Sequence, residues 1–263
     1  MPRLLKQIRE GNMFKHDSIE KNVGLMIVLM MLAISIGGLV EIVPLFFIND
    51  TIEKVDGVRP NTPLELRGRD IYVREGCFLC HSQMVRPFRD EQMRYGHYSL
   101  AAESQYDHPF QWGSKRTGPD LARVGKKYSN EWQVAHLMDP QSMVPESVMP
   151  HYSFLVKTKL DYSDVADRMA ALRLTGVPYS ANQAEYDNNV KQFGEDVAKA
   201  LHIPNAQKSL VDQAQNGFGG APGNYDGDAS NITEMDALVA YLQVLGTMVD
   251  FKKYDNDQFV KYR

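Results

Sequence analysis

Two cysteines and a histidine form the most chemically specific pattern in this chain. Cys77 and Cys80 are separated by two residues, and His81 follows the second cysteine directly. This C-x-x-C-H spacing is typical of covalent haem attachment, because each thiol can add to one vinyl group of the same porphyrin. The adjacent imidazole then lies under the iron as an axial ligand. The spacing therefore predicts one covalent haem c, held by Cys77 and Cys80 and ligated by His81.

Other uses of the two thiols fit the sequence less well. The chain contains two cysteines in all, so there is no second pair for a zinc ribbon. A thioredoxin-like redox pair is expected beside a βαβ pattern, which the residues around Cys77 do not show. A lone structural disulfide, with His81 beside it by chance, is the other alternative.

The second axial ligand decides what such a haem can do. An open position would bind gases or peroxide, whereas a methionine thioether would make the haem an electron carrier with a raised reduction potential. Met143 and Met149 both fall in a loop expected between helices, and we favour Met149 because Pro150 stiffens the backbone beside it. Four histidines are rival ligands: His97, His108, His136 and His151.

A long apolar run precedes the haem motif. It extends from Val23 to Ile48 and is interrupted by Ser35, Gly37, Gly38, Glu41 and Pro44. A bilayer core needs about 20 apolar residues in a helix, so the run predicts a single transmembrane anchor. No cleavage site typical of a signal peptide follows it. Five basic residues in segment 1–22 predict that this end stays in the cytoplasm.

The anchor divides the chain into regions of different composition. We expect a cytoplasmic segment at 1–22, the anchor at 23–48, a connector at 49–61, a haem domain at 62–249 and a polar tail at 250–263. Within the haem domain, residues 179–230 are polar and end in a Gly-rich stretch, which predicts a surface insertion. The net charge of −4 argues against a nucleic-acid partner.

Helix signals indicate how the haem motif is positioned. A helix is expected to begin at Thr62, because Pro63 suits the first helical position and Glu65 completes a capping box. Apolar residues at helical spacing continue through the motif, which predicts that Cys77 and Cys80 lie on the buried face of this helix. Further helices are expected at about 129–139, 163–174 and 232–245. The fold is therefore predicted to be mainly α.

A haem also brings two propionate groups, which need hydrogen-bond donors where they are partly buried. The segment after the motif is rich in such donors. The candidates are Arg86, Trp112 and Arg116. A solvated loop with ordinary basic residues is the alternative interpretation of this segment.

Several segments together resemble a known family. They are Gly37–Pro44, Arg74–Arg89, Tyr95–Ser99, Trp112–Leu121 and Val144–Pro150. They look like the mono-haem cytochrome c subunit (subunit II, FixO/CcoO type) of cbb3-type cytochrome c oxidase. The resemblance extends over about 18–176 and resumes at 233–249, so the insertion at 179–230 departs from it.

The resemblance implies a class I cytochrome c domain behind one transmembrane helix. It implies that His81 and Met149 are the axial ligands of the haem iron. It also implies that the carbonyl of Pro119, in a Gly-Pro turn, accepts the N–H of the proximal imidazole. In this class the first and last helices cross at a small residue and aromatic contacts, which Gly68 and Tyr241 match.

The same resemblance implies partners and a location. The partners would be a haem–copper catalytic subunit, a di-haem cytochrome c subunit, membrane lipid and a soluble or anchored cytochrome c donor. The chain would lie in a bacterial inner membrane with its haem domain in the periplasm. It would transfer electrons without catalysing bond chemistry itself. The alternatives are a nitric oxide reductase small subunit, a haem-based gas sensor or gas-binding module, and a structural assembly subunit.

Overall fold

The computed structural model describes residues 16–45, 52–113, 115–220, 222–228 and 230–254. The chain separates into two compact units, Met1–Thr51 and Ile52–Arg263. Three predicted features lie outside the described residues: most of the basic N-terminal segment, the end of the anchor at 46–48, and the tail from residue 255.

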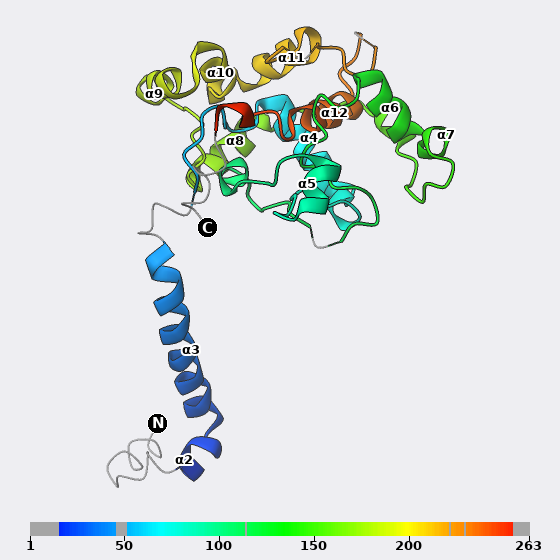
Figure 1. The fold of residues 1–263 in the computed structure, drawn as a ribbon. Helices are drawn as coiled ribbons and strands as arrows, with labels where there is room; N and C mark the ends of the chain where they lie inside the picture. The colour runs from blue at the N-terminus through cyan, green and yellow to red at the C-terminus, as the bar shows by residue number, and fades with distance from the viewer. Residues whose placement is uncertain (1–15, 46–51, 114, 221, 229, 255–263) are drawn as a thin grey trace. The chain divides into compact units, whose positions relative to one another are not determined.

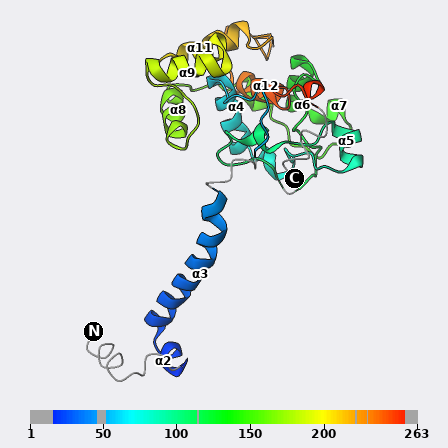
Figure 2. The same ribbon diagram turned by 60° about the vertical axis from the view of Figure 1, so that its left-hand side comes forward.

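The first unit contains the predicted anchor. It consists of α2 (His16–Glu20) and α3 (Val23–Leu45), and α3 is one continuous helix (Figure 2). Its 23 residues extend about 34 Å, which exceeds a hydrocarbon core of about 30 Å. None of its residues is buried within the protein. Among the described residues, α3 is the one helix long and apolar enough to cross a membrane.

The second unit is a bundle of short helices (Figure 1). Its α-helices are α4 (Pro63–Arg74), α5 (Arg89–Tyr95), α6 (Asn130–Met138), α7 (Pro140–Met143), α8 (Val165–Leu174), α9 (Gln183–Phe193), α10 (Glu195–Ala200), α11 (Ala206–Asn216) and α12 (Glu234–Val244). Short 3-10 helices lie at Cys77–Leu79, Ala101–Ser104, Ser153–Val156, Ile203–Asn205 and Phe251–Lys253. The described residues contain isolated β-bridges but no strand, so the predicted mainly helical fold is confirmed.

The crossing of α4 with α12 forms the centre of this unit. A Cβ atom at Gly68 would lie 1.9 Å from the carbonyl oxygen of Ala237, so only glycine allows the two backbones to approach this closely. One turn further along α4, the rings of Tyr72 and Tyr241 are 5.5 Å apart and tilted by 57°. Both tyrosines are almost fully buried. The crossing implied by the family resemblance is therefore present in the structure.

Replacing Gly68 with alanine is expected to destabilise the second unit. The added methyl group would meet backbone atoms of α12, which cannot move aside as a flexible side chain can. Overpacking of this kind usually costs about 1–3 kcal/mol, which corresponds to a fall of roughly 3–10 °C in the melting temperature. Thermal unfolding of the purified protein would measure this change.

Gly38→Ala is the matched control for that substitution. Gly38 also lies inside a helix, but a Cβ there would meet no atom within 4 Å. We expect the control to melt at the temperature of the parent protein. Equal melting temperatures for Gly68→Ala and Gly38→Ala would contradict the close crossing.

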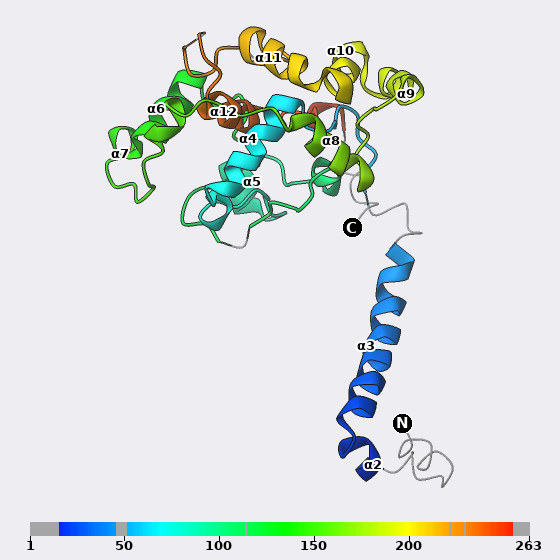
Figure 3. The same ribbon diagram turned by 180° about the vertical axis from the view of Figure 1, so that it is seen from behind.

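The insertion differs from the surface segment expected from its composition. Its helices α9, α10 and α11 form a row along one side of α4 and α12 (Figures 1 and 3). Leu201 and Leu210 are fully buried in the same core as α4. The hydroxyl of Thr62 donates to Gln213 over 2.5 Å. Segment 179–230, although polar overall, thus forms amphipathic helices whose apolar sides complete the core around α4.

The predicted position of the two thiols on α4 is wrong. The helix begins as expected, with the Thr62 N–H donating to Glu65 over 2.8 Å, but it ends at Arg74. Gly76 then adopts a left-handed conformation with φ of 69°, and a short 3-10 helix begins at Cys77. Cys77 and Cys80 therefore lie in a separate turn, where Cys77 is half-buried and Cys80 is exposed.

Candidate haem site

The turn after α4 presents two thiols and an imidazole from consecutive positions. The backbone carbonyl of Cys77 accepts hydrogen bonds from the N–H groups of Cys80 and His81, over 3.2 and 2.9 Å. Both cysteines are free thiols. Burial raises the pKa of the Cys77 thiol to about 12, which keeps it neutral. The turn thus gathers the groups that the C-x-x-C-H pattern predicts, with neither sulfur used in a disulfide.

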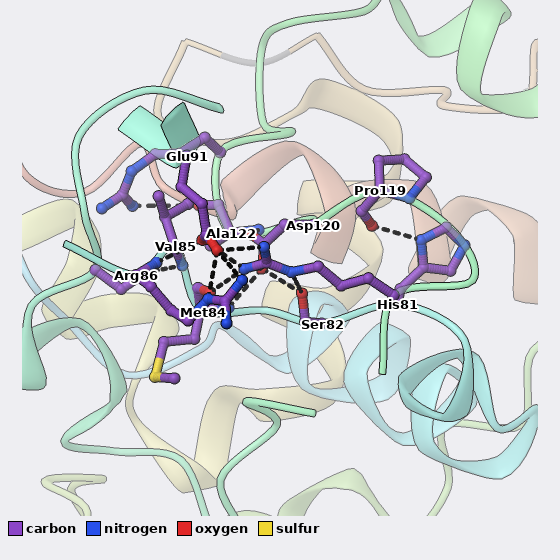
Figure 4. Close-up of polar contacts among 12 residues, drawn as sticks. His81, Ser82, Met84, Val85, Arg86, Glu91, Pro119, Asp120 and Ala122 are labelled. Atoms are coloured by element: carbon purple, nitrogen blue, oxygen red, sulfur yellow. Dashed lines mark hydrogen bonds and ion pairs between the residues drawn. The ribbon is translucent and has the colours of Figure 1, made fainter. Parts of the chain in front are cut away.

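The imidazole of His81 is held from one side by the chain at 118–119. Its Nδ1 lies 2.8 Å from the carbonyl oxygen of Pro119, so Nδ1–H is the donor and Nε2 is left with a lone pair (Figure 4). A Cβ at Gly118 would lie 2.3 Å from the ring carbon Cε1. Glycine is therefore required where the chain passes the ring. Two adjacent thiols and an oriented imidazole with a free Nε2 fit a covalent haem c.

A buried carboxylate lies directly after Pro119. Asp120 is fully shielded from solvent and accepts from the Ser82 hydroxyl over 2.5 Å. It also accepts from the backbone N–H groups of Met84 and Ala122, each over 2.9 Å (Figure 4). Asp120 thus connects the chain that follows His81 with the chain that follows Pro119.

An ion pair supports this carboxylate from outside. The guanidinium of Arg116 donates to the Ser82 hydroxyl over 2.6 Å and to the Met84 carbonyl over 2.8 Å. It also forms a bidentate ion pair with Glu91, a buried residue of α5, in which both N···O distances are 2.7 Å. Glu91 in turn accepts from the backbone N–H and the side chain of Arg86. Hydrogen bonds from Arg116, with those from Arg86, hold the pKa of Glu91 down at about 2.

The depressed pKa of Glu91 predicts a contribution to stability that depends on pH. A carboxyl with a pKa of about 2 in the folded protein and 4.5 ordinarily stabilises the fold above pH 4.5. That contribution is lost as the pH falls from 4.5 towards 2, and it amounts to at most about 3 kcal/mol. Unfolding of the parent and of Glu91→Gln should therefore differ most at pH 6 and converge towards pH 3.

Comparison with Glu91→Gln removes the effect of other acids. Burial raises the pKa of Asp107 and of Asp236 to about 6, so both add stability at low pH and lose it as the pH rises. Both groups are present in parent and variant, and their effect cancels in the difference. A difference in stability that does not change between pH 6 and pH 3 would contradict the role of Glu91.

The loop with the predicted methionine packs against the core of the second unit. Met149 is partly buried and packs against the same core as Cys77. Gln141 donates to its carbonyl over 3.2 Å and so fixes the arch of the loop. Burial raises the pKa of the Tyr152 hydroxyl, and the nearby Cys77 thiol adds to the rise. Met143 ends α7 instead and is 38% exposed.

The rival histidines have different surroundings. His97 stacks on Phe251 with ring centroids 4.1 Å apart, and His151 lies 3.6 Å from Asp139 at the surface. His136 stacks on Trp132 in α6, where burial and the neighbouring His81 lower its pKa. His136 is therefore the rival histidine for which the structure shows an electrostatic interaction with His81.

The predicted propionate donors already have partners within the protein. Arg86 and Arg116 share Glu91, and the indole N–H of Trp112 donates to Ser104 over 3.2 Å. Arg116 also donates to Ser82 and Met84. The three assignments stay predictions. The roles of Glu91 and Asp120 were not predicted, and the Gly118-Pro119-Asp120 run was the signal nearest to them.

Comparison with protein families gives a match. The family described as "Cytochrome C oxidase, mono-heme subunit/FixO" matches residues 16–249, which covers α3 and nearly the whole second unit. A search of curated proteins found no match.

Proposed function

Because the chain belongs to the FixO family of mono-haem cytochrome c oxidase subunits, we propose that it carries electrons to the oxygen-reducing centre of a cbb3-type oxidase. The observation that carries the proposal is the site around His81. Two free thiols lie next to an imidazole whose Nδ1 is 2.8 Å from the carbonyl of Pro119. That arrangement fits covalent attachment of a haem and an imidazole ligand to its iron.

The roles of individual residues follow from this proposal. Cys77 and Cys80 would hold the haem through thioethers, and His81 Nε2 and Met149 sulfur would be the axial ligands. A bound haem supplies reversible one-electron chemistry at iron. The Pro119 carbonyl keeps the His81 ring in one orientation, so little rearrangement accompanies a change of charge. The soft thioether of Met149 would favour the reduced state and raise the reduction potential. Arg86, Trp112 and Arg116 stay candidates for the propionates.

The proposed arrangement in the cell follows the anchor. The helix α3 would span the inner membrane in contact with lipid and with other subunits. The five basic residues before it favour an N-terminus in the cytoplasm and a haem domain in the periplasm. Electrons would come from a soluble or anchored cytochrome c, and a di-haem cytochrome c subunit and a haem–copper catalytic subunit would complete the complex. In this arrangement the haem domain would extend over 62–249, as proposed from the sequence.

Purification in mild detergent tests the function. We expect a haem–copper subunit to co-purify with this chain. We also expect the spectrum of a c-type haem, which becomes reduced when reduced cytochrome c is added. A gas sensor would instead purify without the haem–copper subunit and bind carbon monoxide readily when reduced. A nitric oxide reductase subunit would co-purify with a nitric oxide-reducing partner. Either outcome would overturn the proposal.

A further inference from the structure

The structure joins two chain segments that are far apart in sequence at the proximal side of the site. The N–H of Gly118 donates to the carbonyl of Cys80 over 2.9 Å, and the N–H of Leu121 donates to the carbonyl of Ser82 over 2.8 Å. These two backbone bonds flank the contact between His81 and Pro119. The segment that carries the imidazole and the segment that carries its acceptor are therefore held together above and below that contact.

Among the described residues, Asp120 has the only carboxylate that accepts hydrogen bonds from both of these segments. Its two oxygens accept from donors on both segments: the Ser82 hydroxyl and Met84 N–H on one, and the Ala122 N–H on the other. The guanidinium of Arg116 also reaches Asp120, over 3.4 Å, so this buried carboxylate has neutral donors and one charged donor. Hydrogen bonds to a carboxylate are strong and directional links. Its position is further limited because Arg116 also holds the Ser82 hydroxyl, over 2.6 Å.

We propose that Asp120 is a positioning residue for the proximal ligand. By linking Ser82 to the chain that follows Pro119, it keeps the Pro119 carbonyl within hydrogen-bond distance of His81 Nδ1. Arg116 and Glu91 support the link, because the ion pair from α5 fixes the Ser82 hydroxyl and the Met84 carbonyl. This inference rests on the haem-binding role proposed above.

The direction of the effect follows from the chemistry of the imidazole. A hydrogen bond from Nδ1–H to a carbonyl increases the electron density on Nε2 and makes it a more basic ligand. A more basic ligand favours the oxidised metal. When the link loosens, the His81–Pro119 bond weakens, and the reduction potential should rise.

The test is Asp120→Asn in the intact, haem-loaded oxidase. The amide keeps one acceptor oxygen but turns an NH₂ group towards a backbone N–H donor, so at least one hydrogen bond is lost. We expect hydrogen exchange in the peptides covering 80–85 and 117–122 to become about tenfold faster or more. The midpoint potential of the c-type haem should rise at the same time.

Two further variants separate the link from charge and from misfolding. Asp90→Asn removes the same charge from an exposed position on α5, next to Glu91. Ser82→Ala removes the hydroxyl link but changes no charge, and it decides the matter if Asp120→Asn does not fold. We expect Ser82→Ala to change exchange and potential in the same direction as Asp120→Asn, and Asp90→Asn to leave exchange unchanged.

Failure of this inference is distinct from failure of the proposed function. If the parent protein carries a c-type haem but exchange and potential in Asp120→Asn and Ser82→Ala match those of Asp90→Asn, the positioning role is wrong and the function stands. If the parent protein carries no haem, the function itself is wrong, and this inference is wrong with it.

Discussion

Replacing Cys77 and Cys80 together by serine is expected to leave the chain without any covalently bound haem. A serine hydroxyl does not form the thioether that survives denaturation, and the chain has no other cysteine to replace the lost pair. After denaturing electrophoresis, haem stain should be present in the parent band and absent from the double variant. The effect is all or none, because no other bond proposed here outlasts unfolding.

The single variants Cys77→Ser and Cys80→Ser provide the comparison. Each retains one thiol and should keep one thioether, with a shifted spectrum. Full haem stain in the double variant would contradict covalent attachment through these residues. A double variant that lacks haem but supports full oxidase turnover would instead favour the structural assembly role.

Replacing Met149 with alanine should produce the second large effect. Loss of a thioether ligand removes the preference for reduced iron, so the midpoint potential should fall by at least about 0.1 V, within the range of ~0.8 V that axial ligands span. The vacated position should also bind carbon monoxide when the protein is reduced. A redox titration and a carbon monoxide difference spectrum measure the two changes.

Met143→Ala is the matched control for the ligand assignment. Met143 belongs to the same region of chain but ends α7 with its side chain partly exposed. We expect this variant to keep the parent potential and to exclude carbon monoxide. The reverse result, with Met143→Ala affected and Met149→Ala unchanged, would move the axial ligand to Met143. If neither variant has an effect, His136 becomes the next candidate for the axial ligand, because His81 influences its pKa.

Local signals in the sequence predicted the helix starts well. Thr62 precedes α4 as expected, and the helices expected from about 129 and 232 begin at Asn130 and Glu234. The side chains of Ser129 and Thr233 accept from the first turns of α6 and α12. These signals are reliable because a helix N-terminus has unpaired N–H groups, and the residues that satisfy them lie within a few positions.

Other features depended on contacts that a single sequence does not reveal. The apolar spacing through Cys77 suggested a continuing helix, but α4 ends at Arg74 and Gly76 adopts a left-handed conformation before the motif. The polar composition of 179–230 concealed helices whose few apolar residues, such as Leu210, complete the core. Asp120 contacts Ser82 and Met84, which lie 38 and 36 residues before it in the sequence. Only the folded chain brings these residues together.

The basic residues after the motif illustrate why pairings are difficult to predict. Arg86 and Arg116 suggested contacts to haem propionates, because partly buried propionates need hydrogen-bond donors and both residues follow the motif. In the structure both contact Glu91, a single carboxylate that had no distinguishing pattern around it. Arg116 also donates to Ser82 and Met84, in the segment that follows His81.

The most direct test of the haem-carrying role is the mass of the tryptic peptide that contains Cys77, Cys80 and His81, taken from the membrane-extracted protein. The account predicts that this peptide carries the added mass of one haem, bound through both sulfur atoms, and that no other peptide does. Recovery of the peptide with two free thiols, or with the thiols joined to each other, would contradict it.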